Sequence, residues 1–129
     1  MTWARGNWYE TVAEAQTTTT TPEDIWTLDM STFFGGPTTL FVEAWVVACE
    51  TAGPGANDRY AMYRTMRRFL RNSTPAYSQG TEDTAEQNEG GNFASGACTL
   101  ELNSSTVRIR ITGLSATIDW VAYIRYLYV

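Results

Sequence analysis

Hydrophobic and polar residues alternate along much of the chain with a period of two, which is typical of half-buried β-strands. The clearest case is 106–112, where Val107, Ile109 and Ile111 share one face and arginines occupy the positions between them. The same period continues over 117–129, where both faces carry large apolar groups. We therefore expect a long final strand that is covered on two sides, for instance by a neighbouring subunit.

Shorter alternating runs predict further strands at 8–16, 25–32, 40–50 and 97–103. Between these runs, Gly, Pro, Asn and Ser residues mark turns, of which 103–105 is a plausible hairpin. The pattern predicts a single all-β domain, a β-sandwich that is jelly-roll-like, with about seven or eight antiparallel strands.

Three segments are less regular. Residues 59–71 fit a helical face through Met62, Met66, Phe69 and Leu70, but they also fit a strand, and the β-rich surroundings favour the strand. Residues 51–58 predict a turn-rich connection, and 73–92 a polar loop.

The composition allows one domain over 1–129 with a core of its own, and 1–9 are expected to form a short N-terminal arm. Hydrophobic residues make up 43% of the chain, and the net charge is −5. We expect no nucleic-acid partner at this charge, no membrane span without a long apolar run, and no signal peptide at the N-terminus.

The chain contains no histidine, and all nine of its basic residues are arginines. The commonest general base and metal ligand is therefore missing, as is the lysine of Schiff-base and phosphate chemistry. We expect no enzyme activity, no cofactor and no metal. Arginine suits planar contacts at interfaces, although a GC-rich genome would explain the bias equally well.

The end of the chain resembles a β-sandwich module of tailed-bacteriophage virion proteins, found at tail-fibre ends and in capsid-associated proteins. The similarity lies in the segment Thr-Val-Arg-Ile-Arg-Ile-Thr-Gly at 106–113 and in Ile118, Trp120 and Ile124 after it. The segments 42–48 and 25–28 are also similar. The resemblance implies a β-sandwich, a turn at Gly113 and a core or interface role for Trp120, with no catalytic residue.

The resemblance implies a structural protein of the virion. Because the domain begins close to Met1, we favour a capsid decoration or cement protein that stabilises the head shell; the alternative is a tail-fibre or tail-appendage module that binds a host-surface glycan or another tail protein. Expected partners are the major capsid protein or tail proteins, and further copies of the chain in a homotrimer. The protein would be assembled in the host cytoplasm and reside on the virion, at the capsid surface rather than the tail.

The chain has five tryptophans and seven tyrosines, more than a small core accommodates. Aromatic and arginine side chains are enriched at protein interfaces, but aromatic side chains also form sugar-binding platforms, which would require an open cleft. The expected interface residues are Trp3, Trp8, Tyr9, Arg67, Arg68, Arg71, Tyr123, Tyr126 and Tyr128. The aromatic arm would dock on its own domain, on a neighbour or on the shell, and deletion of 1–6 would test which.

Three other groups have candidate roles. Arg64, together with Arg67, Arg68 and Arg71, could meet an acidic partner, bind nucleic acid or be solvated. Glu82, Asp83, Glu86 and Glu89 are expected in a solvated loop, with catalysis and calcium binding as alternatives. Cys49 and Cys98 are expected to be small buried side chains, and a disulfide would require neighbouring strands.

Overall fold

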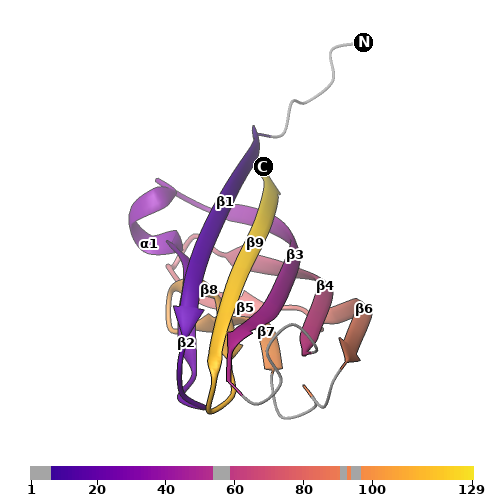
Figure 1. The fold of residues 1–129 in the computed structure, drawn as a ribbon. Helices are drawn as coiled ribbons and strands as arrows, with labels where there is room; N and C mark the ends of the chain where they lie inside the picture. Colours follow the sequence, from indigo (N-terminus) through magenta and orange to yellow (C-terminus); the bar gives the residue numbers. More distant parts are fainter. Residues whose placement is uncertain (1–6, 54–58, 91–92, 94–96) are drawn as a thin grey trace.

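The computed structural model describes residues 7–53, 59–90, 93 and 97–129. Within these residues the chain forms nine strands and one short helix (Figure 1). The elements are β1 (Asn7–Thr17), β2 (Glu23–Asp29), α1 (Met30–Phe33), β3 (Thr38–Ala52), β4 (Tyr60–Arg71), β5 (Tyr77–Gln79), β6 (Asp83–Gly90), β7 (Ala97–Asn103), β8 (Thr106–Thr112) and β9 (Thr117–Tyr128).

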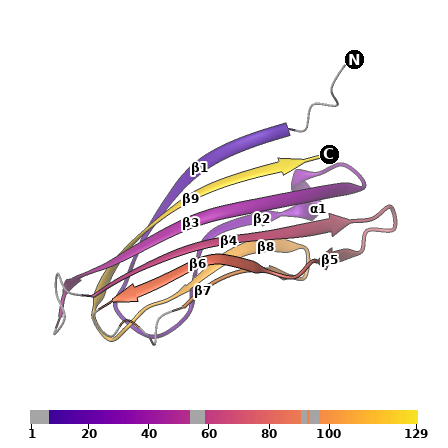
Figure 2. The same cartoon turned by 90° about the vertical axis from the view of Figure 1, so that its right-hand side faces the viewer.

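The strands form two antiparallel sheets. The larger sheet has the order β1-β9-β3-β4-β5, with β6 also paired to β4, and the smaller has the order β2-β8-β7. Figure 2 shows the long, curved strands of the larger sheet lying over the smaller one. The predicted all-β sandwich is confirmed, and its strands divide unequally, six in one sheet and three in the other.

The core lies between the two sheets and follows the alternation in the sequence. Every second residue of β3 from Leu40 to Ala48 is buried, as are alternate residues of β8 and β9. The largest fully buried side chains include Trp120, Phe69, Phe93, Met30, Leu40 and Ile109. The strand faces predicted to be apolar are therefore the faces that make the core.

The segment 59–71 is a strand, as favoured from the sequence. In β4, the buried residues Ala61, Tyr63, Thr65 and Phe69 are all odd-numbered, which is the period of two of a strand and not the spacing of a helical face. The full register of β4 with β3, from Thr38↔Arg71 to Cys49↔Tyr60, supplies the backbone hydrogen bonds that a helix would have made internally.

Two sequence expectations are wrong. Residues 83–90 form β6 rather than loop, because a polar strand is tolerated at a sheet edge where one neighbour, β4, pairs with it. The strand expected at 25–32 stops at Asp29, which caps α1 by accepting a hydrogen bond from the amide of Ser31 at 2.9 Å. Strand β5 also lies within the predicted loop 73–92, and with β5 and β6 the described residues form nine strands, against the expected seven or eight.

The arm expected over 1–9 is wrong for its last three residues, because Asn7 to Tyr9 belong to β1. Asn7 pairs with Tyr128 at the end of β9, so the start of β1 and the end of β9 lie side by side (Figure 1). Trp3 and the rest of 1–6 lie outside the described residues, and so does the docking predicted for the arm.

Gly113 is buried where the chain passes closely over the end of β1. A β-carbon at this position would lie 2.2 Å from Oγ1 of Thr17 and 3.2 Å from the carbonyl oxygen of Thr19. The glycine is thus required by close packing, in addition to the turn expected from the sequence.

We expect Gly113→Ala to destabilise the domain by about 1–3 kcal/mol, because the methyl group overpacks a site with backbone on one side. Urea denaturation monitored by circular dichroism measures this loss. The control is Gly35→Ala, since a β-carbon there has no atom within 4 Å. Equal stability of the two variants would contradict the packing explanation.

Candidate interaction surfaces

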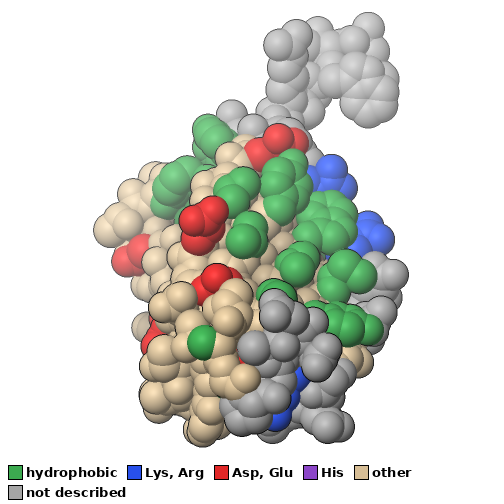
Figure 3. All heavy atoms as spheres, in the orientation of Figure 1, with side chains coloured by type: hydrophobic (Ala, Val, Ile, Leu, Met, Phe, Trp, Pro, Cys, Tyr) green, Lys and Arg blue, Asp and Glu red, His purple; other side chains and the backbone are tan. Residues whose placement is uncertain are grey.

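The solvent-facing side of β1, β9, β3 and β4, called here the outer face, carries many exposed hydrophobic side chains. Figure 3 shows these side chains gathered along the strands of the larger sheet. The large ones are Val12, Phe41, Val47, Tyr60, Met62, Leu70 and Val121. Soluble monomers rarely expose contiguous apolar patches of more than a few hundred Å² (~300–600 Å²), so a face of this kind is a candidate for contact with another molecule.

A charged cluster lies in the middle of the outer face. The carboxylate of Glu43 on β3 accepts hydrogen bonds from Arg64 on β4 at 2.8 Å and from Arg125 on β9 at 2.8 Å. Only 3% of the Glu43 side chain is exposed, against 37% and 36% for the two arginines. The carboxylate is therefore covered by its two partners, although it lies on the solvent side of the sheet.

Trp45 completes this cluster. The guanidinium carbons of Arg64 and Arg125 lie 5.1 and 5.2 Å from its ring centroid, within the range of cation–π attraction. The ring of Tyr123 is 5.6 Å away. These contacts hold a half-exposed tryptophan in a fixed orientation, and such a rigid aromatic–arginine group is typical of the centre of a protein interface.

The two arginines also lower the pKa of Glu43. Burial alone would raise the pKa of this carboxyl group, but the hydrogen bonds and charges of Arg125 and Arg64 outweigh that effect. Glu43 therefore stays ionised at a lower pH than an ordinary glutamate, which keeps the cluster intact.

The sequence did not single out Glu43, Trp45 or Arg125. The signal was nevertheless present, since Glu43 is the one charged residue within the apolar segment 40–48. A charge in such a strand indicates a partner on neighbouring strands.

The three tyrosines predicted at interfaces point in different directions, because alternate residues of a strand face opposite sides. Tyr123 lies on the outer face, whereas Tyr126 is buried on the inner face at 8% exposure. Tyr126 and Tyr128 stack on Tyr9, with ring centroids 5.2 and 5.7 Å apart. Their interface roles and the homotrimer stay predictions.

This end of the sandwich forms a cluster of aromatic rings that also includes Phe33 and Phe34 of the α1 region. Phe33 lies edge-on to Tyr9 at 6.3 Å, and Phe34 packs on Tyr128 at 4.6 Å. The rings pack on one another, but Tyr9 and Phe33 stay 41% and 46% exposed, so part of the cluster faces solvent. A hollow of about 440 Å³ along β1 and β9 is lined by three polar residues, Glu14, Gln16 and Asp119, and by Ala15, Trp120 and Val121.

The arginines of β4 also separate by alternation. Arg64 and Arg68 lie toward the outer face, while Arg67 and Arg71 turn toward the rest of the sandwich. Arg71 donates hydrogen bonds to the carbonyl oxygens of Met30 and Phe34, next to α1. Arg67 donates to the carbonyl oxygens of Gly80 and Leu100. These two arginines hold parts of the fold together, and an interface role for Arg67, Arg68 and Arg71 stays a prediction.

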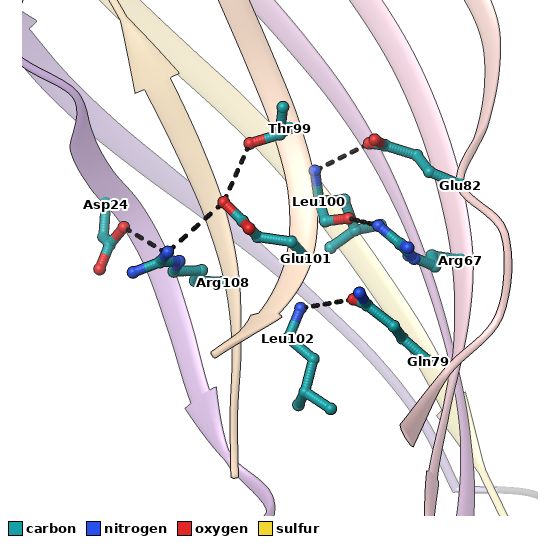
Figure 4. Close-up of polar contacts among 9 residues, drawn as sticks. All are labelled: Asp24, Arg67, Gln79, Glu82, Thr99, Leu100, Glu101, Leu102 and Arg108. Carbon is teal, nitrogen blue, oxygen red and sulfur yellow. Dashed lines mark hydrogen bonds and ion pairs between the residues drawn. The ribbon is translucent and has the colours of Figure 1, made fainter. Parts of the chain in front are cut away.

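The free edge of β7 is saturated by side chains (Figure 4). The amide of Leu100 donates to Glu82 at 2.8 Å, and the amide of Leu102 donates to Gln79 at 2.8 Å. Arg67 donates to the carbonyl oxygen of Leu100 at 2.9 Å. These side chains occupy the hydrogen-bonding positions that an additional strand would use.

The sequence predicted a solvated loop for the acidic residues of 82–89, but part of this group is held in hydrogen bonds within the fold. Glu82 also accepts a hydrogen bond from Thr65 at 2.6 Å, and Glu89 accepts one from Tyr63 at 2.8 Å. Asp83 is exposed, and the side chain of Glu86 is outside the described residues. The side chain of Trp8, one of the predicted interface residues, is also outside the described residues. The described part of the chain contains no cluster of three or more potential metal ligands.

The two cysteines are not bonded to each other. Cys49 is exposed on the outer face, contrary to the expectation that both would be buried, because it occupies an outward position of β3. Cys98 is partly buried; burial, together with the charge of Glu82, raises the pKa of its thiol to about 12. Among the described residues, no helix is long and apolar enough to span a membrane.

Comparisons with known proteins concern the fold. No protein-family model matches the chain, and no curated protein matches it significantly. The crystal structure of the Acinetobacter baumannii phage AM24 tailspike protein is similar over 92% of this chain, with a TM-score of 0.54 and 6% sequence identity. The chain spans 26% of the length of that tailspike chain. At this identity the similarity shows a shared β-rich fold.

Proposed function

We propose that the chain is a structural, non-enzymatic module of a tailed-bacteriophage particle, and that it docks on another particle protein through its outer face. The observation that carries this proposal is the apolar outer face with the Glu43–Trp45 cluster at its centre. The fold similarity to part of a phage tailspike supports the virion setting. The resemblance of 106–124 to phage β-sandwich modules supports it further.

Two positions on the particle follow from different observations. Capsid decoration is supported by the exposed apolar side chains spread over the broad outer face, since attachment to a shell requires a docking face rather than a ligand cleft. A tail appendage is the second candidate, and the tailspike similarity favours it. Immunogold labelling of purified particles distinguishes the two, because decoration gives many labels over the head and an appendage gives few at the tail.

The docking face is tested by Val47→Asp/Val121→Asp introduced into the phage genome. The two valines pair across β3 and β9 and are 49% and 44% exposed, so the two charges repel each other but stay hydrated in the free domain, and they must be desolvated on docking. We expect the purified variant to remain folded by circular dichroism, with a lowered melting temperature, while the amount of protein bound to particles falls about tenfold or more, measured by quantitative immunoblotting.

Matched controls are Val47→Thr/Val121→Thr, which keeps β-branched side chains on the same face, and Thr27→Asp on the exposed side of the smaller sheet. Both should retain normal incorporation. Full incorporation of the double aspartate variant would exclude the outer face as the docking surface. Absence of the wild-type protein from purified particles would exclude the virion role itself.

A further inference from the structure

The edge strands of the two sheets, β1, β5 and β6 in the larger sheet and β2 and β7 in the smaller, differ in how they are protected against an added strand. The edge of β7 is saturated by side chains, and β5 has only three residues. Both β2 and β6 pair through a register shift, which twists an edge away from further pairing. In contrast, β1 pairs with β9 over its whole length without a shift, from Asn7↔Tyr128 to Thr17↔Ile118.

The other side of β1 has no strand partner among the described residues, since β1 is the first strand in the order of its sheet. The sequence of β1 contains no proline, glycine, lysine or arginine, so the features that commonly block an edge are missing, apart from its two glutamates. An uninterrupted edge of this length is a template for an additional strand.

The hydrogen-bond phase identifies which residues of β1 face this free edge. Thr39 and Val129 exchange both backbone hydrogen bonds, so the odd-numbered residues of β9 bond to β3 and the even-numbered ones bond to β1. Through the register of β1 with β9, the even residues of β9 bond to odd residues of β1. The amides and carbonyls of Glu10, Val12 and Glu14 therefore point to the free edge.

The side chains at these same positions indicate the chemistry of a partner. Glu10, Val12 and Glu14 follow one another along the outer face, with Val12 60% exposed between the two carboxylates. An added strand would place its own side chains directly beside them. Basic groups opposite the glutamates and an apolar group opposite Val12 would complement this pattern.

A second copy of β1 does not supply these groups. In an antiparallel pair centred on Val12, each Glu10 would face Glu14 of the other copy, and like charges directly opposite destabilise a pair. Other registers also bring glutamates from both copies to one face of the junction, and β1 itself supplies no basic residue to offset them. The charges of β1 thus disfavour self-pairing at this edge.

We propose that the free edge of β1 binds an extended segment of another protein by strand addition, and that this segment carries Arg or Lys at alternate positions around an apolar residue. Backbone hydrogen bonds to Glu10, Val12 and Glu14 provide the affinity, and the two carboxylates select the basic strand. This inference concerns the backbone edge of β1, which borders the outer face and shares Val12 with it, and it does not depend on a place in the virion.

The probe is a fluorescent peptide with the sequence Thr-Arg-Thr-Val-Thr-Arg-Thr, which reads the same in either direction and so presents its arginines beside the glutamates in both strand orientations. Binding to the full chain is measured by fluorescence anisotropy at low and high salt. We expect saturable binding that weakens with salt, and none for the peptide with Glu in place of Arg. Equal binding of both peptides would overturn the charge selection.

Val12→Pro tests strand addition itself, because proline removes an amide that points to the free edge while the bonds to β9 come from the neighbouring odd residues. We expect roughly a tenfold loss of peptide affinity, and little change for Val12→Thr, which keeps the amide. Glu10→Gln/Glu14→Gln, which leaves the backbone unchanged, should weaken binding and remove its salt dependence.

Undiminished binding by Val12→Pro, with its fold confirmed by circular dichroism, would overturn the proposal. So would a wild-type dimer in sedimentation that Val12→Pro converts to monomer, because that result would identify a second copy as the occupant of the edge. If Val12→Pro does not fold, the glutamine variant decides the question alone, and unchanged affinity for the basic peptide would then exclude the site. Val121 lies opposite Glu14, so independence from the outer-face docking is tested with Val47→Asp alone, which lies two strands from β1 and should leave peptide binding unchanged.

Discussion

Trp120→Ala is expected to destabilise the domain by about 3–5 kcal/mol, a large share of the total stability of a domain of this size. The side chain is 1% exposed, packs edge-on against Phe93 at 5.8 Å and is among the largest in the core. Its removal leaves a cavity that the rigid strands around it cannot fill. Urea denaturation followed by far-ultraviolet circular dichroism measures the loss without relying on tryptophan fluorescence.

Two variants separate packing from hydrogen bonding at this position. The indole Nε1 of Trp120 donates to Oγ1 of Thr17 at 2.9 Å in a buried site. Trp120→Phe keeps most of the side-chain volume but leaves Thr17 without this donor, and we expect it to lower the free energy of unfolding by about 1–2 kcal/mol. Val121→Ala, next in the chain but 44% exposed, should cost less than about 0.5 kcal/mol. A cost for Trp120→Ala no larger than that for Val121→Ala would contradict the assignment of Trp120 to the core.

Glu43→Ala is expected to cost about 2–3 kcal/mol, because it leaves Arg64 and Arg125 close together without their common carboxylate. The loss stays below that for a fully buried pair, since both guanidinium groups are partly exposed and can turn toward water. The stability of Glu43→Gln, which keeps a hydrogen-bond acceptor but no charge, should lie between that of Glu43→Ala and that of the wild type. Equal stability of all three proteins would show that the cluster contributes nothing to folding.

The same cluster predicts a pH dependence with a defined sign. The pKa of Glu43 is lower in the folded protein than in the unfolded chain, so its contribution is fully present above the unfolded value of about 4.3. It is lost as the pH falls through the folded value. The stability difference between the wild type and Glu43→Gln should therefore shrink in acid and stay constant from about pH 5 to 7.

The strands could be predicted from the sequence where one face is buried and the other is polar. Val107, Ile109 and Ile111 are buried in β8 as their alternation indicated, and the same holds for the inward residues of β9. Strand β6 could not be predicted from the sequence, because an edge strand that is paired on one side needs no apolar face and so shows no alternation of apolar and polar residues. The end of β2 depended on Asp29, a single capping side chain inside an apparently continuous run.

The interaction surface was harder to predict, because it depends on which residues become neighbours across strands. Arg67 and Arg68 are adjacent in sequence, yet one reaches the backbone of β7 and the other lies toward solvent. Glu43 and Arg125 are far apart in sequence and meet only through the pairing of β3 with β9. Composition identified the residue types of an interface, but only the register assigned them to one face.

The adjacent ends of β1 and β9 determine how this domain responds to mechanical force. Since Asn7 and Tyr128 are opposite each other in an antiparallel pair, force applied through both ends of the described chain would separate β1 from β9 one hydrogen bond after another. Unzipping of this kind needs less force than shearing, in which many bonds must break together. The domain would therefore resist force better across the broad face of the larger sheet than along the polypeptide.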